Sequence, residues 1–257
     1  MTAGNATLTS VGGSVVETAG GTVNVSGNTA LTAANGSVVL DSTSNNLNGT
    51  VTVSTNSASG TVALANSGNL TVANVSSYNL MLSSANGSIS RIGGSLDLNV
   101  GGNLSLMQAG NLALGTVSAG NISVVSTNGS VSWQYLNANE TLNLSASNNI
   151  SMGNLSADNV LLNSTNGSIS GVNGTLTISG TLGLSTKGDL TVGNVSAGNL
   201  SLSSTSGSVT DTGVLNVSGS TTLVAGNGSI TVANASNALG TVTATAGNTL
   251  NVASGGT

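Results

Sequence analysis

The chain has 257 residues, of which 4% are charged and 1% aromatic, and it contains no Phe, Pro, Cys or His. Its formal charge of −5 leaves no basic surface for nucleic acid or anionic lipid, and the missing residue types exclude disulfides, thiolate metal sites and His-dependent catalysis. The hydrophobic fraction of 38% and the regular return of aliphatic residues indicate a packed core. No apolar run approaches the ~18 residues of a membrane-spanning helix, so we expect no membrane insertion.

The first 67 residues contain short segments in which apolar and small polar residues alternate, such as GTVTVS from Gly49. Alternation with a period of two is typical of a strand that has one buried face. The segments end at Asn-Gly, Ala-Gly or Ser-Gly pairs, as before NGSVVL from Asn35. Because Gly and Asn tolerate positive φ, we expect sharp corners with positive φ at these pairs.

From residue 68 the segments repeat with a period of about 40 residues. A twelve-residue phrase reads NLMLSSANGSIS in its first copy and NLSLSSTSGSVT in its last. Its copies start 42, 38 and 40 residues apart, at Asn79, Asn121, Asn159 and Asn199. Helix-favouring Glu, Lys, Arg and Gln are scarce, and no 3.6-residue periodicity competes with the strand pattern.

Short strands and a period that divides into two coils predict an all-β fold, a right-handed parallel β-helix of about 13 coils of roughly 20 residues. We expect residues 1–257 to form a single β-helix, with looser coils over 1–67 and regular double coils over 68–257. A β-propeller also has repeats of about 40 residues. It is the less favoured alternative, because its blades need longer strands and large side chains between them, whereas this chain has one Trp and no Phe.

The Asn-Leu-Ser-Leu strand openings and Asn-Gly-Ser-Ile/Val corners resemble those of the filamentous haemagglutinin-like adhesins of bacterial two-partner secretion, including the high-molecular-weight adhesins. The resemblance covers nearly the whole chain and is one of composition and repeat style. It implies an internal stretch of an extracellular fibre at the bacterial cell surface, exported through an outer-membrane transporter. The Asn-Pro motif of the family's secretion domain is absent, since the chain has no Pro.

These features predict a structural rod or stalk segment of a secreted adhesin that mediates cell-surface attachment. Its expected partners are further β-helix coils of the same or neighbouring chains and a host or neighbouring-cell surface. The alternative is a self-assembling extracellular filament subunit whose open β-helix edges stack end to end, because neither end shows a capping helix or a charged coil. No cofactor is expected in either case.

Polysaccharide cleavage by a β-helix would need carboxylates clustered in one groove. The carboxylates are instead spread along the chain, at Glu17, Asp41, Asp97, Glu140, Asp158, Asp189 and Asp211. Ser185 and Lys187 have the spacing of a Ser-x-Lys pair, but Ser is so abundant that chance is the better explanation. We therefore predict no enzyme activity, no catalytic residue and no metal site.

Asn-x-Ser/Thr sequons are the one chemical motif in excess. A strand that opens with a turn Asn and then alternates apolar residues with Ser or Thr creates this motif automatically. The resemblance implies glycosylation of some of them, because some high-molecular-weight adhesins carry sugars on such asparagines. The candidate acceptors lie in Asn-Gly-Ser corners, at Asn35, Asn86, Asn128, Asn166 and Asn227.

Trp133 follows one copy of the Gly-Ser-Val-Ser corner. At the same place the other copies of the phrase have Arg91, Gly171 and Asp211. A position that accepts four such different residues is expected to lie at an outward corner. Trp133 and Tyr135 are therefore candidates for a small exposed aromatic patch.

Overall fold

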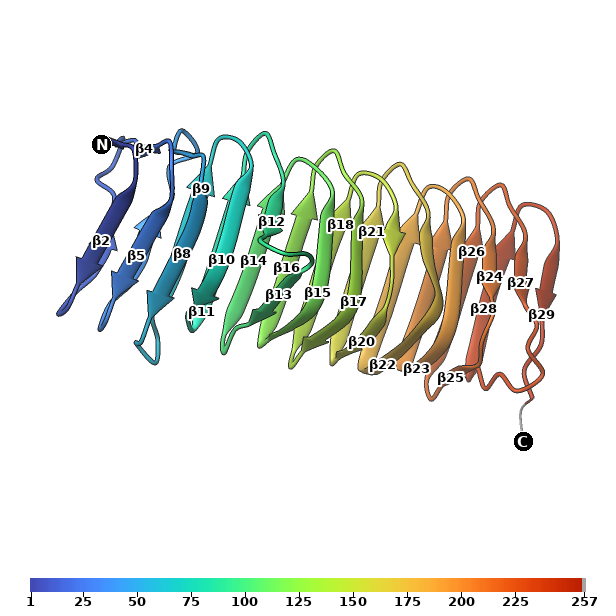
Figure 1. Ribbon diagram of the computed structural model, residues 1–257. Coiled ribbons are helices and arrows are strands. Elements are labelled where there is room, and N and C mark those ends of the chain that lie inside the picture. Colours follow the sequence, from blue (N-terminus) through green and yellow to red (C-terminus); the bar gives the residue numbers. More distant parts are fainter. Residues whose placement is uncertain (256–257) are drawn as a thin grey trace. The chain divides into compact units, whose positions relative to one another are not determined.

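A computed structural model describes residues 1–255, apart from the side chains of residues 172 and 173. These residues form 29 strands and no helix, and so include no helix that could cross a membrane. The chain divides into two compact units, Met1–Thr127 (unit 1) and Asn128–Thr257 (unit 2). Within each unit the paired strands are parallel and lie side by side in successive coils (Figure 1). Parallel pairing confirms the β-helix and excludes a propeller, whose blades are antiparallel.

Unit 1 contains β1 (Thr2–Ala3), β2 (Ala6–Ser10), β3 (Val15–Val16), β4 (Asn24–Val25), β5 (Thr29–Ala33), β6 (Val38–Leu40), β7 (Asn46–Leu47), β8 (Thr50–Thr55), β9 (Thr61–Asn66), β10 (Leu70–Ser76), β11 (Asn79–Ser84), β12 (Ile89–Arg91), β13 (Leu96–Asn99), β14 (Asn103–Gln108), β15 (Leu112–Ala119) and β16 (Asn121–Ser126). Two sheets continue through its coils. One is formed by β2, β5, β8, β10 and β12, and the other by β3, β6, β9, β11, β14 and β16.

The third side of the coil changes place within unit 1. In the first three coils the third strand (β1, β4 and β7) precedes the strand of the β2 sheet in chain order. Later in the unit, β13 instead connects β12 in the β2 sheet to β14 in the β3 sheet, and β13 pairs with β15. The change falls between β7 and β13, an interval that includes the start of the regular sequence repeat near residue 68.

Unit 2 contains β17 (Val131–Ala138), β18 (Thr141–Ala146), β19 (Ile150–Ser151), β20 (Asn154–Ala157), β21 (Asn159–Ser164), β22 (Ile169–Thr186), β23 (Leu190–Ser204), β24 (Val209–Asp211), β25 (Leu215–Val217), β26 (Ser220–Ala225), β27 (Ile230–Val232), β28 (Thr241–Ala246) and β29 (Leu250–Val252). Three parallel sheets run through it. The first contains β19, β24, β27 and β29, the second β20 and β25, and the third β18, β21, β26 and β28. The long strands β22 and β23 bend round the corners and contribute to all three, and β17 contributes to the first and the second.

Aliphatic side chains form the core of each unit in columns. In the first sheet of unit 2, one inward position recurs every 19 to 21 residues and is at most 1% exposed in six successive coils, at Val131, Ile150, Ile169, Leu190, Val209 and Ile230. Fully burying one such side chain stabilises the fold by about 1.5–3 kcal/mol. The expected coil of about 20 residues is therefore confirmed by the packing.

Buried serines recur with the two-coil period of the sequence. The phrase strands β11, β16, β21 and the last part of β23 each end in a buried Ser. In unit 2, Ser164 Oγ donates to the carbonyl of Asn148 and Ser204 Oγ to that of Gly188, both at 2.6 Å. The neighbouring strands β18 and β22 end in Ala146 and Thr186. Thr186 Oγ1 donates to the Gly167 carbonyl at 2.6 Å, so a hydroxyl closes this corner as well, whereas Ala146 has none.

Replacing Ser204 by Ala is expected to lower the free energy of unfolding by about 1–3 kcal/mol, because the Gly188 carbonyl and the Gly207 N–H, 2.9 Å from Ser204 Oγ, both lose a buried partner. Ser203→Ala is the control, since Ser203 is the adjacent residue and is half-exposed. Urea unfolding of both variants checks the prediction. Equal midpoints for the two variants would contradict it.

Most corner glycines lack the positive φ that the sequence suggests. Within residues 1–255, the residues with positive φ are Gly20, Gly93, Gly94 and Gly240. Only Gly20, which follows Ala19, lies in one of the predicted pairs, so the prediction is wrong for the Asn-Gly and Ser-Gly corners. At Gly207 a Cβ would lie 2.5 Å from the backbone nitrogen of Asp189 in the preceding coil, so this corner needs Gly because the coils approach closely.

Candidate functional site

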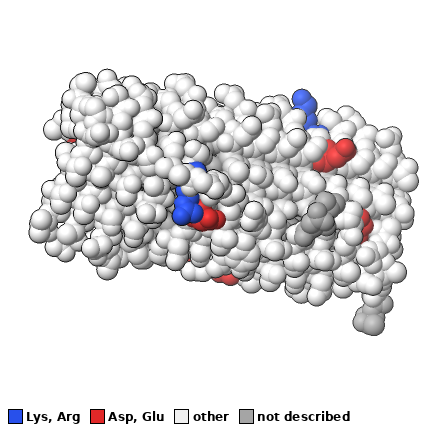
Figure 2. All heavy atoms as spheres, in the orientation of Figure 1, with Lys and Arg blue, Asp and Glu red and all other residues white. Residues whose placement is uncertain are grey.

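Charged side chains are sparse on the outer surface. Figure 2 shows a mostly uncharged face, on which each blue side chain (Lys or Arg) lies beside a red one (Asp or Glu). Arg91 and Asp97 form an ion pair of 2.9 Å on the surface of unit 1. Within residues 1–255, no three His, Cys, Asp or Glu side chains come close enough to hold a metal ion.

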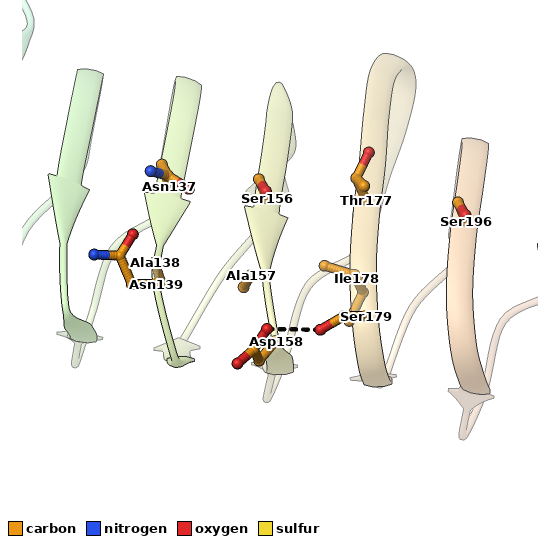
Figure 3. A pocket seen from close by; sticks show the side chains of 10 residues that line it. All are labelled: Asn137, Ala138, Asn139, Ser156, Ala157, Asp158, Thr177, Ile178, Ser179 and Ser196. Atoms are coloured by element: carbon orange, nitrogen blue, oxygen red, sulfur yellow. Dashed lines mark hydrogen bonds between the residues drawn. The ribbon is translucent and has the colours of Figure 1, made fainter.

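The shallow groove on unit 2 shown in Figure 3 crosses four neighbouring strands. Asn137, Ser156, Thr177 and Ser196 project outward from β17, β20, β22 and β23 and form a row of amides and hydroxyls. At the corner beside this row, Ser179 Oγ donates to Asp158 Oδ1 at 2.6 Å. The lining contains one carboxylate, so the groove offers polar contacts but no pair of carboxylates for acid–base chemistry.

Ser185 and Lys187 are both exposed. Ser185 lies near the end of β22 and Lys187 in the corner that follows. Both side chains are open to water, and the interpretation of this pair as a chance spacing stays a prediction.

The sequons fall into two structural classes. Those that open strands use their side-chain oxygen to hold the next coil: Oδ1 of Asn69 accepts from the N–H of Ser88 at 3.0 Å, and Oδ1 of Asn199 from the N–H of Ser220 at 3.0 Å. Asp189 makes the equivalent bond to the N–H of Ser208 at 2.9 Å. These side chains therefore act as caps between coils, a role that the residue pattern alone did not reveal.

The second class comprises the predicted glycan acceptors. All five are exposed at corners, at Asn35, Asn86, Asn128, Asn166 and Asn227. Their side-chain hydrogen bonds include a bond from Asn35 Nδ2 to the Val11 carbonyl at 3.1 Å and a long one from Asn166 Nδ2 to Ser147 Oγ at 3.4 Å. The positions are accessible to a modifying enzyme, and glycosylation stays a prediction.

The predicted exposed aromatic patch is wrong for Trp133. Its side chain is 5% exposed and its indole N–H donates to the Asn154 carbonyl at 3.2 Å. The next two coils have Met152 and Gly171 at the same place, and a Cβ on Gly171 would lie 2.5 Å from Met152 Cε. Large and small residues thus interdigitate in the core, and only Tyr135, 41% exposed, lies on the surface.

The prediction for Trp133 is wrong because it compares residues that are 40 positions apart in the sequence. A 40-residue step samples alternate coils, where this position holds Arg91, Gly171 and Asp211. The coils between them have aliphatic or Met side chains there, all buried, at Val72, Met152, Val192 and Val232. A 20-residue step would have identified an inward position.

Because Trp133 is the single tryptophan in the chain, its fluorescence reports on this core alone. We expect a blue-shifted emission maximum and weak quenching by acrylamide in the native protein, because water and quencher do not reach a 5% exposed indole. In guanidinium the emission should move to longer wavelength and quenching should rise several-fold. Equal quenching of the native and unfolded protein would contradict the buried position.

A buried asparagine joins a carboxylate to the backbone of another coil in each unit. In unit 1, Asn45 Nδ2 donates to Glu17 Oε2 at 2.9 Å while Asn45 Oδ1 accepts from the N–H of Val23 at 2.7 Å. In unit 2, Asn237 Nδ2 donates to Asp211 Oδ2 at 2.7 Å while Asn237 Oδ1 accepts from the N–H of Leu215 at 2.8 Å. Both asparagines are fully buried. We call these two arrangements the carboxylate–Asn clamps.

The clamps lie in loops of similar sequence. The segment SNNLNGTVTV from Ser44 contains the first Asn, and SNALGTVTAT from Ser236 contains the second. The first loop follows β6 and the second follows β27. A search for Ser-Asn-x-Leu followed by Gly-Thr-Val-Thr would have paired them, but the partner carboxylates are 28 and 26 residues away and only the coiling brings them together.

The chain matches one protein-family model, which is described as "Repeats of unknown function (DUF5649)". The match covers residues 1–54 and 182–246, which together are less than half of the chain. Each matched segment contains one carboxylate–Asn clamp. No curated protein has significant similarity to the chain. The same holds for the solved structures.

Proposed function

We propose that the chain is a structural spacer in a secreted bacterial adhesin or surface fibre, where its stacked coils help to hold an attachment region away from the cell. The observation that carries the proposal is the constant register of parallel strands from coil to coil within each unit. Each added coil extends such a stack by one strand spacing, about 4.8 Å. Each added sequence repeat therefore lengthens the stack of coils.

The polar and weakly charged surface supports a role in which the outer faces of the coils are exposed to water. Outward positions carry Ser, Thr and Asn, and the chain has only two cations and seven carboxylates. Such a surface has no strong field to attract charged partners. The resemblance of the strand and corner phrases to filamentous haemagglutinin-like adhesins favours the same role, and the match to a repeat family agrees with a chain built from repeated coils.

Surface labelling of intact cells of the native source tests the location. An antibody against residues 1–257 is expected to bind intact cells, and mild protease treatment should remove the signal. Labelling that requires permeabilised cells would contradict an extracellular spacer.

Attachment can be tested in the same cells. Deleting the segment should reduce adhesion to a surface, and restoring it with one extra pair of coils, made by duplicating residues 159–198, should recover adhesion. A variant that unfolds the stack should fail to recover it. If an unfolded variant restores adhesion as well as the native segment, the folded coils are not required for attachment.

The absence of enzyme activity is a separate prediction. Incubation of the protein with polysaccharides is expected to give no cleaved product.

A further inference from the structure

Five Asn-Gly pairs share the local sequence Asn-Gly-Ser, and the asparagines of all five are exposed at corners. A pair of this kind can deamidate without an enzyme. The backbone nitrogen of the glycine attacks Cγ of the asparagine side chain, the Cγ–Nδ2 bond breaks, and ammonia leaves with the proton of the glycine N–H. Water then opens the succinimide ring and gives aspartate or isoaspartate. Glycine favours the attack because it has no side chain to hinder it.

Asn166 and Asn227 form a matched pair of such corners in unit 2. Both are exposed, and both are followed by Gly-Ser-Ile. A Cβ on Gly167 or on Gly228 would clash with the backbone of the preceding coil. Local sequence, exposure and the close approach of the preceding coil are therefore common to the two corners and do not distinguish their reactivity.

The two corners differ in the hydrogen bonding of the glycine N–H. The Gly167 N–H donates to Ser164 Oγ at 3.2 Å, and this hydroxyl is fixed by its own bond to the Asn148 carbonyl at 2.6 Å. Three residues before Gly228 the chain has Ala225, which is buried and has no hydroxyl. Within residues 1–255, the Gly228 N–H has no hydrogen-bond partner. The attacking nitrogen is thus held at the first corner and free at the second.

The asparagine side chains differ in the same sense. Asn166 Nδ2 lies 3.4 Å from Ser147 Oγ, whereas the Asn227 side chain makes no hydrogen bond to any described residue. In unit 1, Asn35 also follows a strand that ends in Ala, but its Nδ2 donates to the Val11 carbonyl at 3.1 Å. Asn227 therefore lies at a corner where neither reacting group is held.

We propose that Asn227 is a site of spontaneous deamidation, and that the Ser164 hydroxyl protects Asn166 from the same reaction. Before the glycine nitrogen can attack, its proton must pass to a base from the solvent and the peptide must turn toward the side chain. The hydrogen bond to Ser164 Oγ opposes both steps. Loss of one ordinary hydrogen bond before the attack corresponds to a rate difference of about three- to tenfold.

Deamidation of Asn227 would disturb the corner of the next coil. Asn248 Nδ2 donates to the Asn227 carbonyl at 2.9 Å, and the Asn248 N–H donates to the Gly228 carbonyl at 3.0 Å. Isoaspartate lengthens the backbone by one atom and moves the peptide link from the main-chain carbonyl to the side chain. The two bonds to Asn248 cannot then both keep their geometry, and either product adds a negative charge.

Incubation of the native chain in mildly alkaline buffer, followed by peptide mass spectrometry of each corner, tests the proposal. The urea-unfolded chain is the reference, because the shared Asn-Gly-Ser sequence should there give similar rates at all five corners. In the native chain, Asn227 is expected to deamidate at least about threefold faster than Asn166. Equal native rates, a faster reaction at Asn166, or no product at Asn227 after the unfolded chain has reacted fully would each overturn the proposal.

Two substitutions exchange the hydrogen bonding of the two corners. Ser164→Ala should raise the rate at Asn166 by about three- to tenfold and leave that at Asn227 unchanged. Ala225→Ser should slow the reaction at Asn227, because it offers the Gly228 N–H an acceptor. Asn163→Ala is the control, since Asn163 is adjacent to Ser164 but half-exposed.

The rate at Asn227 in the Ser164→Ala variant separates local protection from general loss of stability. Acceleration at both corners would show that the variant reacts by unfolding, and it would overturn the protective role of the hydroxyl. An unchanged rate at Asn166 would overturn it as well. These rates do not depend on where the protein is located, so their outcome is independent of the spacer function.

Discussion

Leu162→Ala is expected to lower the free energy of unfolding by about 2–5 kcal/mol, whereas Leu161→Ala should change it by less than about 0.5 kcal/mol. The two residues are neighbours in β21, but Leu162 is fully buried and Leu161 is 54% exposed. Leu162 lies between Leu144 and Leu184 in adjacent coils. Truncating it leaves a cavity that two fixed strands cannot close. Leu161 lies beside Asn143 and Gly183 on the outer face and leaves no cavity.

Urea unfolding followed by Trp133 fluorescence measures this difference in the unit that contains both residues. Leu161→Ala removes the same atoms from the same strand and is the internal control for strand propensity. Equal losses in both variants would mean that the inward and outward faces of β21 are wrongly assigned. A one-residue change of register would produce that result, since it exchanges the faces of a strand.

Asn237→Ala is expected to destabilise the protein by about 3 kcal/mol, because it removes both ends of a carboxylate–Asn clamp. The N–H of Leu215 loses its acceptor in the core, and Asp211 Oδ2 loses a donor at 2.7 Å. Asn216→Ala is the control, since Asn216 is an exposed Asn on β25 in the same unit. Urea midpoints of the two variants give the comparison.

A double-mutant cycle with Asp211→Ala separates the two halves of the clamp. Once Asn237 is absent, Asp211→Ala should cost less than it does in the native protein, because their hydrogen bond is already lost. Additive losses would show that Asp211 and Asn237 act independently. That result would remove the clamp as the feature shared by the two segments of the family match.

The sequence predicted the parts of the fold that depend on local pattern. Alternation in NVLLNS and its copies identified strands with one buried face, and the phrase copies identified the double coil. The sequence did not predict the side-chain hydrogen bonds that connect one coil to another. The hydroxyl of Ser204 and the carbonyl of Gly188 are sixteen residues apart, and nothing local distinguishes this Ser from the exposed ones around it. The corner glycines were identified, but the reason for them is the backbone of the preceding coil.

The candidate sites were less predictable for the same physical reason. Trp133 was predicted to lie on the surface because alternate coils have Arg or Asp at its position. An inward-facing column can nevertheless contain a charged residue where the side chain extends from a corner to a hydrogen-bond partner. Arg91 does so through the carbonyl of Ala73 and through Asp97, and Asp211 through Asn237. The exposed Asn-Gly-Ser corners were placed correctly because a turn between two strands is itself a local feature.

The distance between two labels on either side of an inserted pair of coils tests most directly whether repetition builds length. The chain has no Cys, so Asn143→Cys and Thr243→Cys, both exposed on the third sheet of unit 2, allow specific spin labelling. If residues 159–198 are duplicated after residue 198, the new coils should enter the stack in register and lengthen the label distance by two strand spacings, about 10 Å. An unchanged distance, or one spread over a broad range, would contradict a stack in which each coil adds the same step.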